Sequence, residues 1–333
     1  MGVTTGQARA VVMREYGPPG VLTCAAVPLP SLGPAEVRIR TLAAAVNHTD
    51  LEIRAGNWPV RRPDPFPYVP GVEAVGEVEA VGEAVRAVRP GACVITMMQG
   101  LGGVRAERPG GYAEYVTVAA AAIAPVPAGV DPLDMAALGL AGVTAYEGLR
   151  RIRPLAGRRV LVTGAAGGVG SAAVLVARAR GARVTAVVTH PEQAEHVRAL
   201  GADQVIVAPK SGPPPQLDPA SVDGVLDTVG GGLFGPCVGA LRPGGTLSLV
   251  GAVAGGDVGF DAWQLIRPVT LTGYSSESLD GAALREAVAA LAGWLATGAI
   301  RPPPRTVMPL AEAARAHALL EAGGVTGRVL LVP

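Results

Sequence analysis

Three observations in the sequence predict a two-domain α/β protein. Its 333 residues suit two compact domains rather than one. Residues 1–127 hold many short apolar segments separated by glycine and proline, which predicts a small β-barrel or sandwich. Residues 128–268 alternate strand and helix patterns, which predicts a parallel sheet with right-handed crossovers. The pattern changes again over residues 269–333, which form a third segment.

The individual elements follow from their apolar periods. In the first segment Val37 and Ile39 alternate with charged residues, as in a half-buried strand, and further strands are expected at "GVEAVGEVEAVG", "ACVITM" and "YAEYVTV". The middle segment begins with the helical stretch "MAALGLAGVTAYEGLRRI". Its later strands are "RRVLVTG", "ARVTAVVT", "VDGVLDTVG" and "GGTLSLVG", and its helices are "VGSAAVLVARARG" and "PEQAEHVRALG". The last segment is predicted to form the helices "DGAALREAVAALAGWLATG" and "PLAEAARAHALLEAGG" and the strand "GRVLLVP".

Composition excludes several classes of protein. The net charge of +1 and the 17% of charged residues predict neither a basic patch for nucleic acid nor an acidic tail. Cys24, Cys93 and Cys237 form no C-x-x-C pair, so neither a disulfide framework nor a structural zinc site is expected. The first residues carry no apolar signal region, and no apolar run reaches the roughly 18 residues of a membrane span. We therefore expect a cytoplasmic protein with no membrane partner.

The strongest chemical motif is the glycine-rich stretch "LVTGAAGGVGSAAV". Gly164, Gly167 and Gly170 follow a predicted strand and open a predicted helix, with Gly168 and Val169 between them. Glycine allows the tight turn and lets the backbone approach a pyrophosphate, which the free N–H groups and the dipole of the helix N-terminus favour. The five residues are predicted to bind a dinucleotide cofactor.

The end of the next strand bears on which dinucleotide binds. NAD-binding proteins usually have an acid there for the ribose hydroxyls, whereas this chain has Thr189 and His190. An acid would repel a 2′-phosphate, and a hydroxyl and an imidazole tolerate one, so NADPH is favoured. Glu192 lies two residues further on and no Lys or Arg is adjacent, so an ordinary loop remains an alternative interpretation of Thr189 and His190.

The motifs together resemble the medium-chain dehydrogenase/reductase superfamily, and specifically its zinc-free quinone oxidoreductase, or ζ-crystallin-like, branch. The stretch "AVNHTDLEIRAG" resembles the V-N-x-x-D-x-x-x-R-x-G pattern of that branch through Asn47, Asp50, Arg54 and Gly56. Other motifs follow in the order of the family along nearly the whole chain: "YVPGVEAVGEVEAVG", "GGYAEYV", "GLAGVTAYEGL", "GAAGGVG", "LRPGGTLSLVG" and "TGRVLLV".

The resemblance implies a fold and a type of reaction. A GroES-like β-barrel built from the first and last segments would flank a Rossmann domain, with the active site in a cleft between them. Members of the branch are commonly homodimers that pair Rossmann edge strands, for which "PVTLTGYS" is the candidate here. Zinc-dependent members have Cys at the position of Asn47 and His at that of Val72, so no bound metal is expected. Without a Lewis acid, conjugate reduction of an enone, enoyl thioester or quinone is favoured over alcohol oxidation.

Three residues are candidates for catalysis. The resemblance places Asn47 near the nicotinamide, where its amide would donate to a substrate carbonyl. His48 is a candidate proton donor because its usual pKa is near neutrality. Thr144 matches a threonine beside the nicotinamide ring. The alternatives are a turn-stabilising Asn, a surface His on a loop, and a Thr packed against the sheet.

Further residues are assigned by position. Glu52, where many relatives have Tyr, and Trp58, Tyr68 and Tyr274 are candidates for the substrate pocket. Gly251 and Arg328 are candidates for binding the cofactor.

Some polar residues are instead expected to be structural. Asp50 and Arg54 are expected to form a charge pair that shapes their loop, and Tyr112 to lie in the barrel core. His196 and His317 are expected on solvent-facing sides of helices.

The sequence thus predicts a zinc-independent, NADPH-dependent reductase that transfers hydride to a quinone or an α,β-unsaturated carbonyl, with a polyketide-type enoyl intermediate as one possible substrate. Three alternatives stay open: a redox-silent NADPH-binding sensor or scaffold, a non-redox step in biosynthesis, and a zinc alcohol dehydrogenase with unusual ligands.

Overall fold

The computed structural model describes residues 6–29, 31–58, 61, 65–101, 108–323 and 325–333. They form two compact units. Unit 1 comprises Met1–Leu140, Ser276–Ala296 and Pro304–Pro333, and unit 2 comprises Ala141–Ser275 and Thr297–Pro303. These boundaries differ from the predicted ones, after residues 127 and 268. One reason is that the first turns of helix α2 (Pro132–Leu149) are bound to unit 1 through the N–H of Leu140, which donates to Glu73.

Unit 1 is built mainly of antiparallel strands, in line with the many short strands that the pattern of the first segment predicted. The larger sheet has the order β14-β15-β3-β4-β5-β7, with β6 paired to β3, and β1 and β2 form a separate ribbon. The strands are β1 (Gln7–Val12), β2 (Thr23–Pro28), β3 (Glu36–Ala45), β4 (Glu73–Val81), β5 (Cys93–Met97), β6 (Tyr115–Ala119), β7 (Ile123–Pro125), β14 (Arg305–Pro309) and β15 (Arg328–Val332). Alternate residues of β3, among them Val37 and Ile39, are fully buried in the core.

The closing strand β15 joins the first segment of the chain to the last. It pairs antiparallel with the end of β3, with Leu330 opposite Ala45, and Val46 N–H donates to Val329 O at 2.9 Å. This register brings Arg328, at the start of β15, next to the residues that follow β3.

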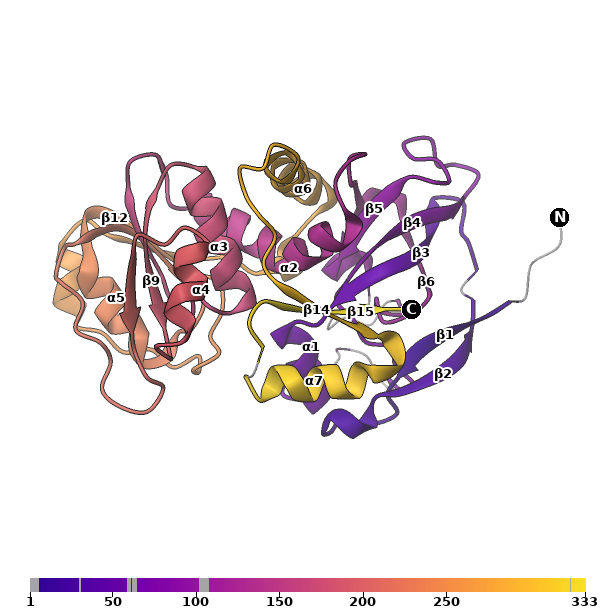
Figure 1. Cartoon of the computed structure of the whole chain (residues 1–333), viewed down its shortest axis with the longest axis horizontal. Helices are drawn as coiled ribbons and strands as arrows, with labels where there is room; N and C mark the ends of the chain where they lie inside the picture. The colour runs from indigo at the N-terminus through magenta and orange to yellow at the C-terminus, as the bar shows by residue number, and fades with distance from the viewer. Residues whose placement is uncertain (1–5, 30, 59–60, 62–64, 102–107, 324) are drawn as a thin grey trace. The chain divides into compact units, whose positions relative to one another are not determined.

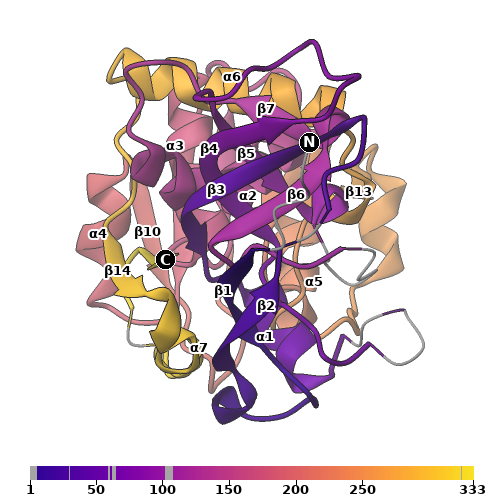
Figure 2. The same ribbon diagram turned by 90° about the vertical axis from the view of Figure 1, so that its right-hand side faces the viewer.

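Within its described residues, unit 1 wholly contains the α-helices α1 (His48–Ala55), α6 (Gly281–Ala296) and α7 (Ala313–Glu321). Figure 2 shows α6 beside β7, and Figures 1 and 2 show α1 and α7 together at the other end of the strands. The expectation of a loop after Asn47 was wrong, because His48–Ala55 is helical. Asp50 caps the helix by accepting from Asn47 N–H, and Gly56 ends it in the left-handed region at φ +81°.

Unit 2 is a doubly wound parallel sheet of six strands in the order β10-β9-β8-β11-β12-β13. The strands are β8 (Arg159–Val162), β9 (Arg183–Val188), β10 (Gln204–Val207), β11 (Val222–Asp227), β12 (Leu241–Leu249) and β13 (Thr270–Gly273). The helices α3 (Gly168–Ala179) and α4 (Gln193–Ala199) lead outward from β8 in one direction, and α5 (Phe234–Ala240) leads in the other. Right-handed crossovers therefore place α5 on the opposite face of the sheet, as Figure 1 shows. Ligands of such sheets bind where the strand order reverses, here between β8 and β11.

Short 3-10 helices connect several elements. Those in the described residues are Pro19–Val21, Met98–Gly100, Ala120–Ala122, Gly231–Leu233, Ala262–Ile266, Ser276–Ser278 and Leu310–Glu312. None of the described helices combines the length and the apolar character that crossing a bilayer requires.

Candidate active site

The glycine-rich loop joins β8 to α3 in unit 2, as predicted. Gly164 adopts φ +57°, and a Cβ atom there would lie 2.5 Å from Thr228 Oγ1. A Cβ at Gly170 would lie 2.2 Å from Gly164 O, so only glycine permits this approach of helix to strand. Gly167 is the N-cap of α3 and has no side chain to occupy the N–H groups of the first turn, which includes Gly168 and Val169. The loop therefore offers free N–H donors and a helix dipole to an anion such as a pyrophosphate.

A buried carboxylate, not anticipated from the sequence, holds the neighbouring loop. Asp227 ends β11, and its Oδ1 accepts from Thr163 Oγ1 at 2.6 Å, from Val229 N at 2.9 Å and from Gly230 N at 3.1 Å. These bonds fasten the loops that follow β8 and β11 to each other at the point where the strand order reverses. Gly251 follows β12 beside them, and a Cβ there would lie 2.9 Å from Thr228 O, which accounts for glycine at this position.

Thr189 and His190 follow β9 and direct their donors at one acceptor. Gln193 Oε1 accepts from Thr189 N at 3.1 Å, from Thr189 Oγ1 at 3.2 Å and from His190 N at 3.1 Å. Two backbone N–H groups and a hydroxyl therefore converge on a single oxygen atom. Gln193 was not singled out in the sequence, although a glutamine four residues after the strand-ending threonine can reach back in this way.

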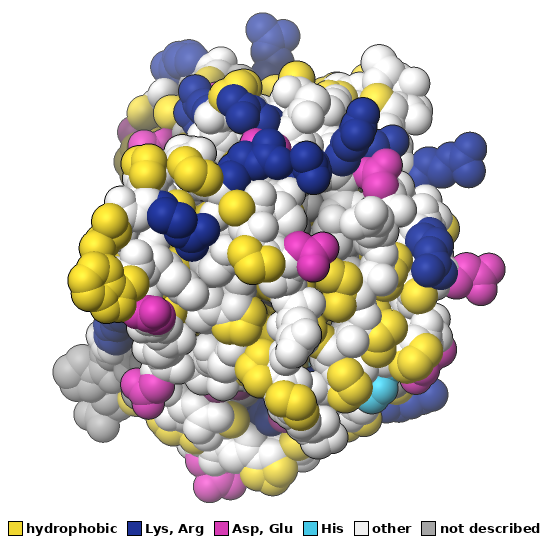
Figure 3. All heavy atoms as spheres, turned by 90° about the vertical axis from the view of Figure 1, so that its left-hand side faces the viewer, with side chains coloured by type: hydrophobic (Ala, Val, Ile, Leu, Met, Phe, Trp, Pro, Cys, Tyr) yellow, Lys and Arg dark blue, Asp and Glu magenta, His cyan; other side chains and the backbone are white. Residues whose placement is uncertain are grey.

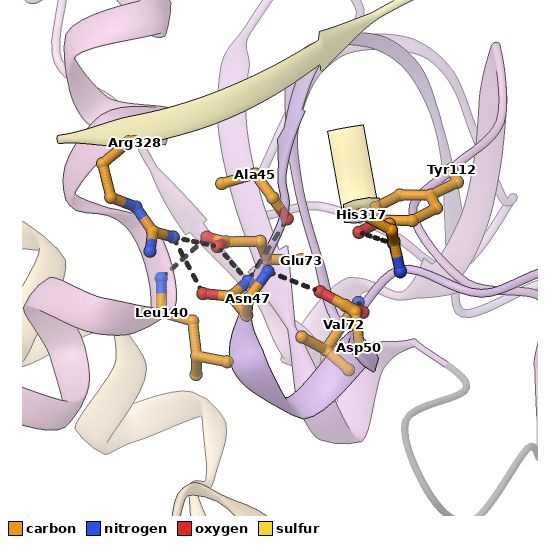
Figure 4. A network of polar contacts seen from close by, with 9 residues as sticks. All are labelled: Ala45, Asn47, Asp50, Val72, Glu73, Tyr112, Leu140, His317 and Arg328. Atoms are coloured by element: carbon orange, nitrogen blue, oxygen red, sulfur yellow. Dashed lines mark hydrogen bonds and ion pairs between the residues drawn. The ribbon is translucent and has the colours of Figure 1, made fainter. Parts of the chain in front are cut away.

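In unit 1, Asn47 is the centre of a buried polar network (Figure 4). Its Nδ2 donates to Glu73 Oε1 at 2.7 Å and to Ala45 O at 3.2 Å, and its Oδ1 accepts from Arg328 Nη2 at 2.8 Å. Both amide hydrogens are thus engaged, so donation to a substrate would require one of these bonds to be exchanged. Asn47, Glu73 and Arg328 are all more than nine-tenths buried.

The carboxylates of this network have shifted pKa values. Burial raises the pKa of Glu73, and the nearby Arg328 cation opposes that rise. Burial also raises the pKa of Asp50, to about 7, although the N–H groups of Asn47 and Val72 favour the ionised form. Since perturbed carboxylates cluster at functional sites, these shifts support a functional role for the network.

Glu73 also fixes a kink in α2. Its Oε2 accepts from Leu140 N at 2.7 Å, next to Gly139 at φ +37° and ψ −137°. A Cβ on residue 139 would lie 1.9 Å from Glu73 Oε2, so glycine makes room for the carboxylate. Glu73 was recognised in the sequence only as part of "GVE". Its place directly after Val72, where the family resemblance puts a metal ligand, was the available signal.

The donor set does not suit zinc. Among the residues that the structure describes, no cluster of three or more His, Cys, Asp or Glu side chains is arranged to hold a metal ion. At the positions where the family resemblance places metal ligands, Asn47 bridges Glu73 and Arg328, and Val72 presents its backbone N–H to Asp50 at 3.0 Å. These groups are occupied with one another and include no thiolate or imidazole.

Comparison with known proteins identifies the family. The alcohol dehydrogenase GroES-like domain model matches residues 33–128, and the zinc-binding dehydrogenase model matches residues 200–331. A quinone oxidoreductase of Lama guanicoe is 30% identical over 345 residues, which cover 99% of this chain and 99% of that protein. The chain belongs to the medium-chain dehydrogenase/reductase superfamily. Unit 1 accordingly contains the GroES-like domain and unit 2 the Rossmann-type sheet, which confirms the predicted fold class.

Other members of the superfamily show the range of its activities. An alcohol dehydrogenase of Moraxella sp. (strain TAE123) is 33% identical over 261 residues, which cover 72% of this chain and 76% of that protein. The crystal structure of Escherichia coli quinone oxidoreductase complexed with NADPH matches with a TM-score of 0.84 at 26% identity, over 98% of this chain and 100% of that chain. The protein is therefore similar to oxidoreductases that differ in substrate.

The other predicted site residues of this superfamily member lie on both units. On α1, His48 Nε2 lies 3.2 Å from Glu52 Oε1, and the two side chains form a partly exposed pair.

Trp58 is half-buried after α1, next to residues 59–60, which lie outside the described part of the chain. Tyr68 is buried and its backbone bridges to Met13. Burial raises the pKa of Tyr68 far above that of an ordinary phenol, which makes it a poor proton donor.

In unit 2, Thr144 is buried on α2. Tyr274 follows β13, and the guanidinium of Arg151 lies 4.9 Å from the centroid of its ring.

Two expectations about unit 1 were wrong. Asp50 and Arg54 do not pair with each other, because Asp50 accepts from the N–H groups of Asn47 and Val72, whereas Arg54 binds Glu321. His317 is fully buried rather than solvent-facing. The helical period alone could not show this, because His317 contacts Arg54 of α1, with Nδ1 3.4 Å from Arg54 Nη1.

Two other expectations concern Tyr112 of unit 1 and His196 of unit 2. Tyr112 lies in the core of unit 1, as expected, with no exposed surface. His196 is half-buried rather than solvent-facing, with Nε2 3.3 Å from Ser171 Oγ.

Proposed function

We propose that the protein is a zinc-independent, NADPH-dependent reductase that transfers hydride to a quinone or an α,β-unsaturated carbonyl. The observation that carries the proposal is the neutral amide of Asn47, which bridges Glu73 and Arg328 where zinc-dependent relatives have a thiolate. Such a site would act on a polar substrate group without a Lewis acid, which suits hydride addition to a conjugated carbon better than oxidation of an alcohol. Relatives of this chain include quinone oxidoreductases, which supports the acceptor class.

Unit 2 fits a dinucleotide. The N–H groups at the start of α3, at the reversal of strand order between β8 and β11, suit a pyrophosphate. When bound, the reduced nicotinamide would supply the hydride. The chain's own residues would bind and orient both reactants.

The donors around Gln193 support NADPH over NADH. Thr189 N, Thr189 Oγ1 and His190 N already converge on one carbonyl oxygen within 3.2 Å, and a phosphate oxygen can accept from the same three groups. The acid nearest to them, Glu192, has a side chain that is 77% exposed and lies 4.0 Å from the His190 ring. We expect the 2′-phosphate to displace the Gln193 side chain and to take its bonds.

Arg328 is the candidate for stabilising negative charge on the reduced acceptor. Asn47 uses both amide hydrogens within the protein, whereas Arg328 Nε is buried and has no partner in the described part of the chain. A buried guanidinium favours an enolate in its vicinity. In this proposal Asn47 and Glu73 hold Arg328 in place, and Arg328 carries the electrostatic effect.

The test is cofactor consumption by the purified, chelator-treated protein with quinones, enones and enoyl thioesters, using NADPH and NADH in parallel. Turnover with NADPH that survives the chelator supports the proposal. Activity that disappears with the chelator and returns with zinc would indicate a zinc alcohol dehydrogenase instead. Tight NADPH binding without turnover on any acceptor would favour a redox-silent sensor or a non-redox step.

The cofactor choice has its own test. Thr189→Val removes one of the three converging donors and leaves the two N–H groups in place. We expect NADPH affinity to fall about tenfold, the loss of one hydrogen bond to a charged group, with NADH affinity nearly unchanged. Equal losses for both cofactors would place Thr189 away from the 2′-phosphate.

We also propose that the protein forms a homodimer through β13, the last strand of the six-stranded sheet. Five of the large exposed hydrophobic residues among those described lie in the segment that precedes β13 in the chain: Val253, Val258, Trp263, Leu265 and Ile266. Figure 3 shows hydrophobic side chains reaching the surface between polar ones on one face of the molecule. An unpaired strand edge beside apolar surface favours pairing with a second copy.

The dimer is tested by charge substitutions. Ile266→Asp should produce monomers in sedimentation velocity, because its side chain is 72% exposed in the single chain and would be buried on pairing. Val207→Asp, on the opposite edge strand β10, is the matched control and should leave the dimer intact. A monomeric wild-type protein would refute the proposal.

A further inference from the structure

A line of buried polar groups leads from the Asn47 network toward the surface, and Figure 4 shows its inner part, the contact of Asp50 with Asn47 and that of Tyr112 with His317. The Tyr112 hydroxyl favours the ionised form of the Asp50 carboxylate, and Tyr112 Oη lies 3.2 Å from His317 Nε2. His317 Nδ1 lies 3.4 Å from Arg54 Nη1, and Arg54 also binds Glu321. Four of these residues are at most 2% exposed: Asp50, Tyr112, His317 and Arg54. The line joins α1, which carries Asp50 and Arg54, to α7, which carries His317 and Glu321.

The chemistry of the groups fixes the direction of the line. A guanidinium only donates, so His317 Nδ1 accepts from Arg54. Burial and the Arg54 cation lower the pKa of His317 to about 3, so the ring is neutral and its one hydrogen is on Nε2. His317 Nε2–H then donates to Tyr112 Oη, and the Tyr112 hydrogen is directed at the Asp50 carboxylate. Each group thus orients the next, and the last acceptor is Asp50.

Asp50 ties together the two halves of the Asn47 network. Its Oδ2 accepts from Asn47 N at 2.9 Å, and its Oδ1 accepts from Val72 N at 3.0 Å. Since Val72 precedes Glu73, a single carboxylate positions the backbone of both partners in the bond from Asn47 Nδ2 to Glu73 Oε1. A shift of Asp50 would change the separation between these two side chains.

We infer that His317 is a positioning residue of the active site, which orients the Tyr112 hydroxyl onto Asp50 and so sets the geometry of Asn47 and Glu73. The inference rests on the proposed function where activity is the readout, but not where the geometry itself is measured. A role in packing alone predicts that any substitution of His317 with a similar volume has the same effect. A positioning role depends on which nitrogen is preserved.

Two substitutions separate these roles. In His317→Gln the side-chain amide nitrogen reaches the position of Nε2 and can still donate to Tyr112. In His317→Asn the amide oxygen reaches the position of Nδ1 and can still accept from Arg54, but the bond to Tyr112 is lost. Tyr112→Phe removes the hydroxyl and keeps the ring. Arg315→Ala, whose side chain is 77% exposed on the same helix, is the control for changes in α7.

The first readout is geometric and does not need a substrate. The amide proton shifts of Asn47 and Val72 report their bonds to Asp50, and the nitrogen shifts of His317 report its tautomer. We expect His317→Asn and Tyr112→Phe to move both amide resonances, whereas His317→Gln and Arg315→Ala leave them close to wild type. Equal movement in the Gln and Asn variants, or a wild-type ring protonated on Nδ1, would overturn the inference.

The second readout is turnover. We expect kcat to fall by up to about 100-fold in His317→Asn and Tyr112→Phe, the scale of a misplacement of about 1 Å, with little change in the Kd for NADPH. His317→Gln should restore most of the rate. Equal rates in the Asn and Gln variants would contradict the inference. A wild-type protein without turnover would refute the proposed function, and the amide shifts would then decide the inference.

The pH profile gives a third readout. The titratable groups facing Asp50 are Glu73 of β4 and the tyrosines Tyr68 and Tyr112, with His317 and Arg54 one contact further. Loss of the Tyr112 donor removes a bond that favours the ionised carboxylate, so the pKa of Asp50 rises. The acid limb of kcat/KM should therefore move to higher pH in His317→Asn and return in His317→Gln. If the acid limb of kcat/KM stays at the wild-type pH in both variants, the inference is contradicted.

Discussion

Replacing Asn47 with Asp tests the proposed bridge between Glu73 and Arg328. The oxygen that keeps the place of Oδ1 still accepts from Arg328. The other oxygen replaces Nδ2, which lies 2.7 Å from Glu73 Oε1 and 3.2 Å from Ala45 O. Both neighbours are acceptors, so the substitution turns two hydrogen bonds into repulsive contacts.

The magnitude follows from the distance. Two ionised carboxylates whose oxygens lie 2.7 Å apart repel each other by about 6 kcal/mol at an effective dielectric constant of about 20. The pair avoids this by binding one proton, which raises the pKa of the pair above that of the unfolded chain. A group whose pKa is higher in the folded state than in the unfolded state contributes fully to the free energy of unfolding below its unfolded-state pKa. That contribution is lost as the pH rises toward and through its folded-state pKa. The loss is about 1.4 kcal/mol per pH unit, or up to about 4 kcal/mol between pH 5 and pH 8.

Urea unfolding at pH 5 and pH 8 measures this loss. The free energy of unfolding of Asn47→Asp, relative to wild type, should fall between the two pH values. Asn47→Ala is the control, since it loses the same bonds without adding a charge and should show a deficit of about 1–3 kcal/mol that does not grow with pH. If the two variants show the same pH dependence, the amide does not lie between Glu73 and Arg328 in the way described.

Two further predictions concern the same unit. Gly139→Ala should lower the free energy of unfolding by about 2 kcal/mol or more, because its Cβ would meet Glu73 Oε2 at 1.9 Å. Gly244→Ala is the control and should cost less, because residue 244 has φ +82° but open space around it. Thermal unfolding of the two variants measures both losses, and equal losses would contradict the prediction. The pKa of His317 is lowered from 6.5 to about 3, so the wild type should lose about 1.4 kcal/mol per pH unit as pH falls from 6.5 toward 3, a slope that His317→Gln should lack. Unfolding at pH 4, 5.5 and 7 measures both slopes, and equal acid slopes would refute this role of the buried imidazole.

The sequence predicted the elements whose burial follows a simple period. The parallel strands of unit 2 are short runs of Val, Leu and Ala, and the glycine spacing located the start of α3. Shorter elements gave weaker patterns, and α1, α5, β10 and the β1–β2 ribbon were not predicted. In α1 the alternation of polar and apolar residues covers eight positions, which is too few for the helical period to stand out from a loop.

The candidate site was predicted in part, because it depends on contacts between residues far apart in the chain. Asn47 and Asp50 stand three apart at a helix start, a spacing typical of a capping box, so their local role was accessible. The partner of Asn47, Arg328, lies 281 residues away, and His317 lies 263 residues from Arg54. The pairing of β15 with β3 creates the first contact and the packing of α7 on α1 the second, and neither can be read from a local pattern.

The identity of residue 47 is tied to the charges around it. The side chain there must donate to the Glu73 carboxylate and accept from the Arg328 guanidinium, and an amide does both while remaining neutral. A thiolate accepts only, and it would add a negative charge beside Glu73 and Asp50, both of which are already buried. A bound cation would offset that charge in a zinc-dependent relative, whereas among the residues that the structure describes the cation paired with Glu73 is Arg328. The exchange of Cys for Asn is therefore a change in the charge balance of the whole network, which supports a reaction in which Arg328 stabilises the developing charge.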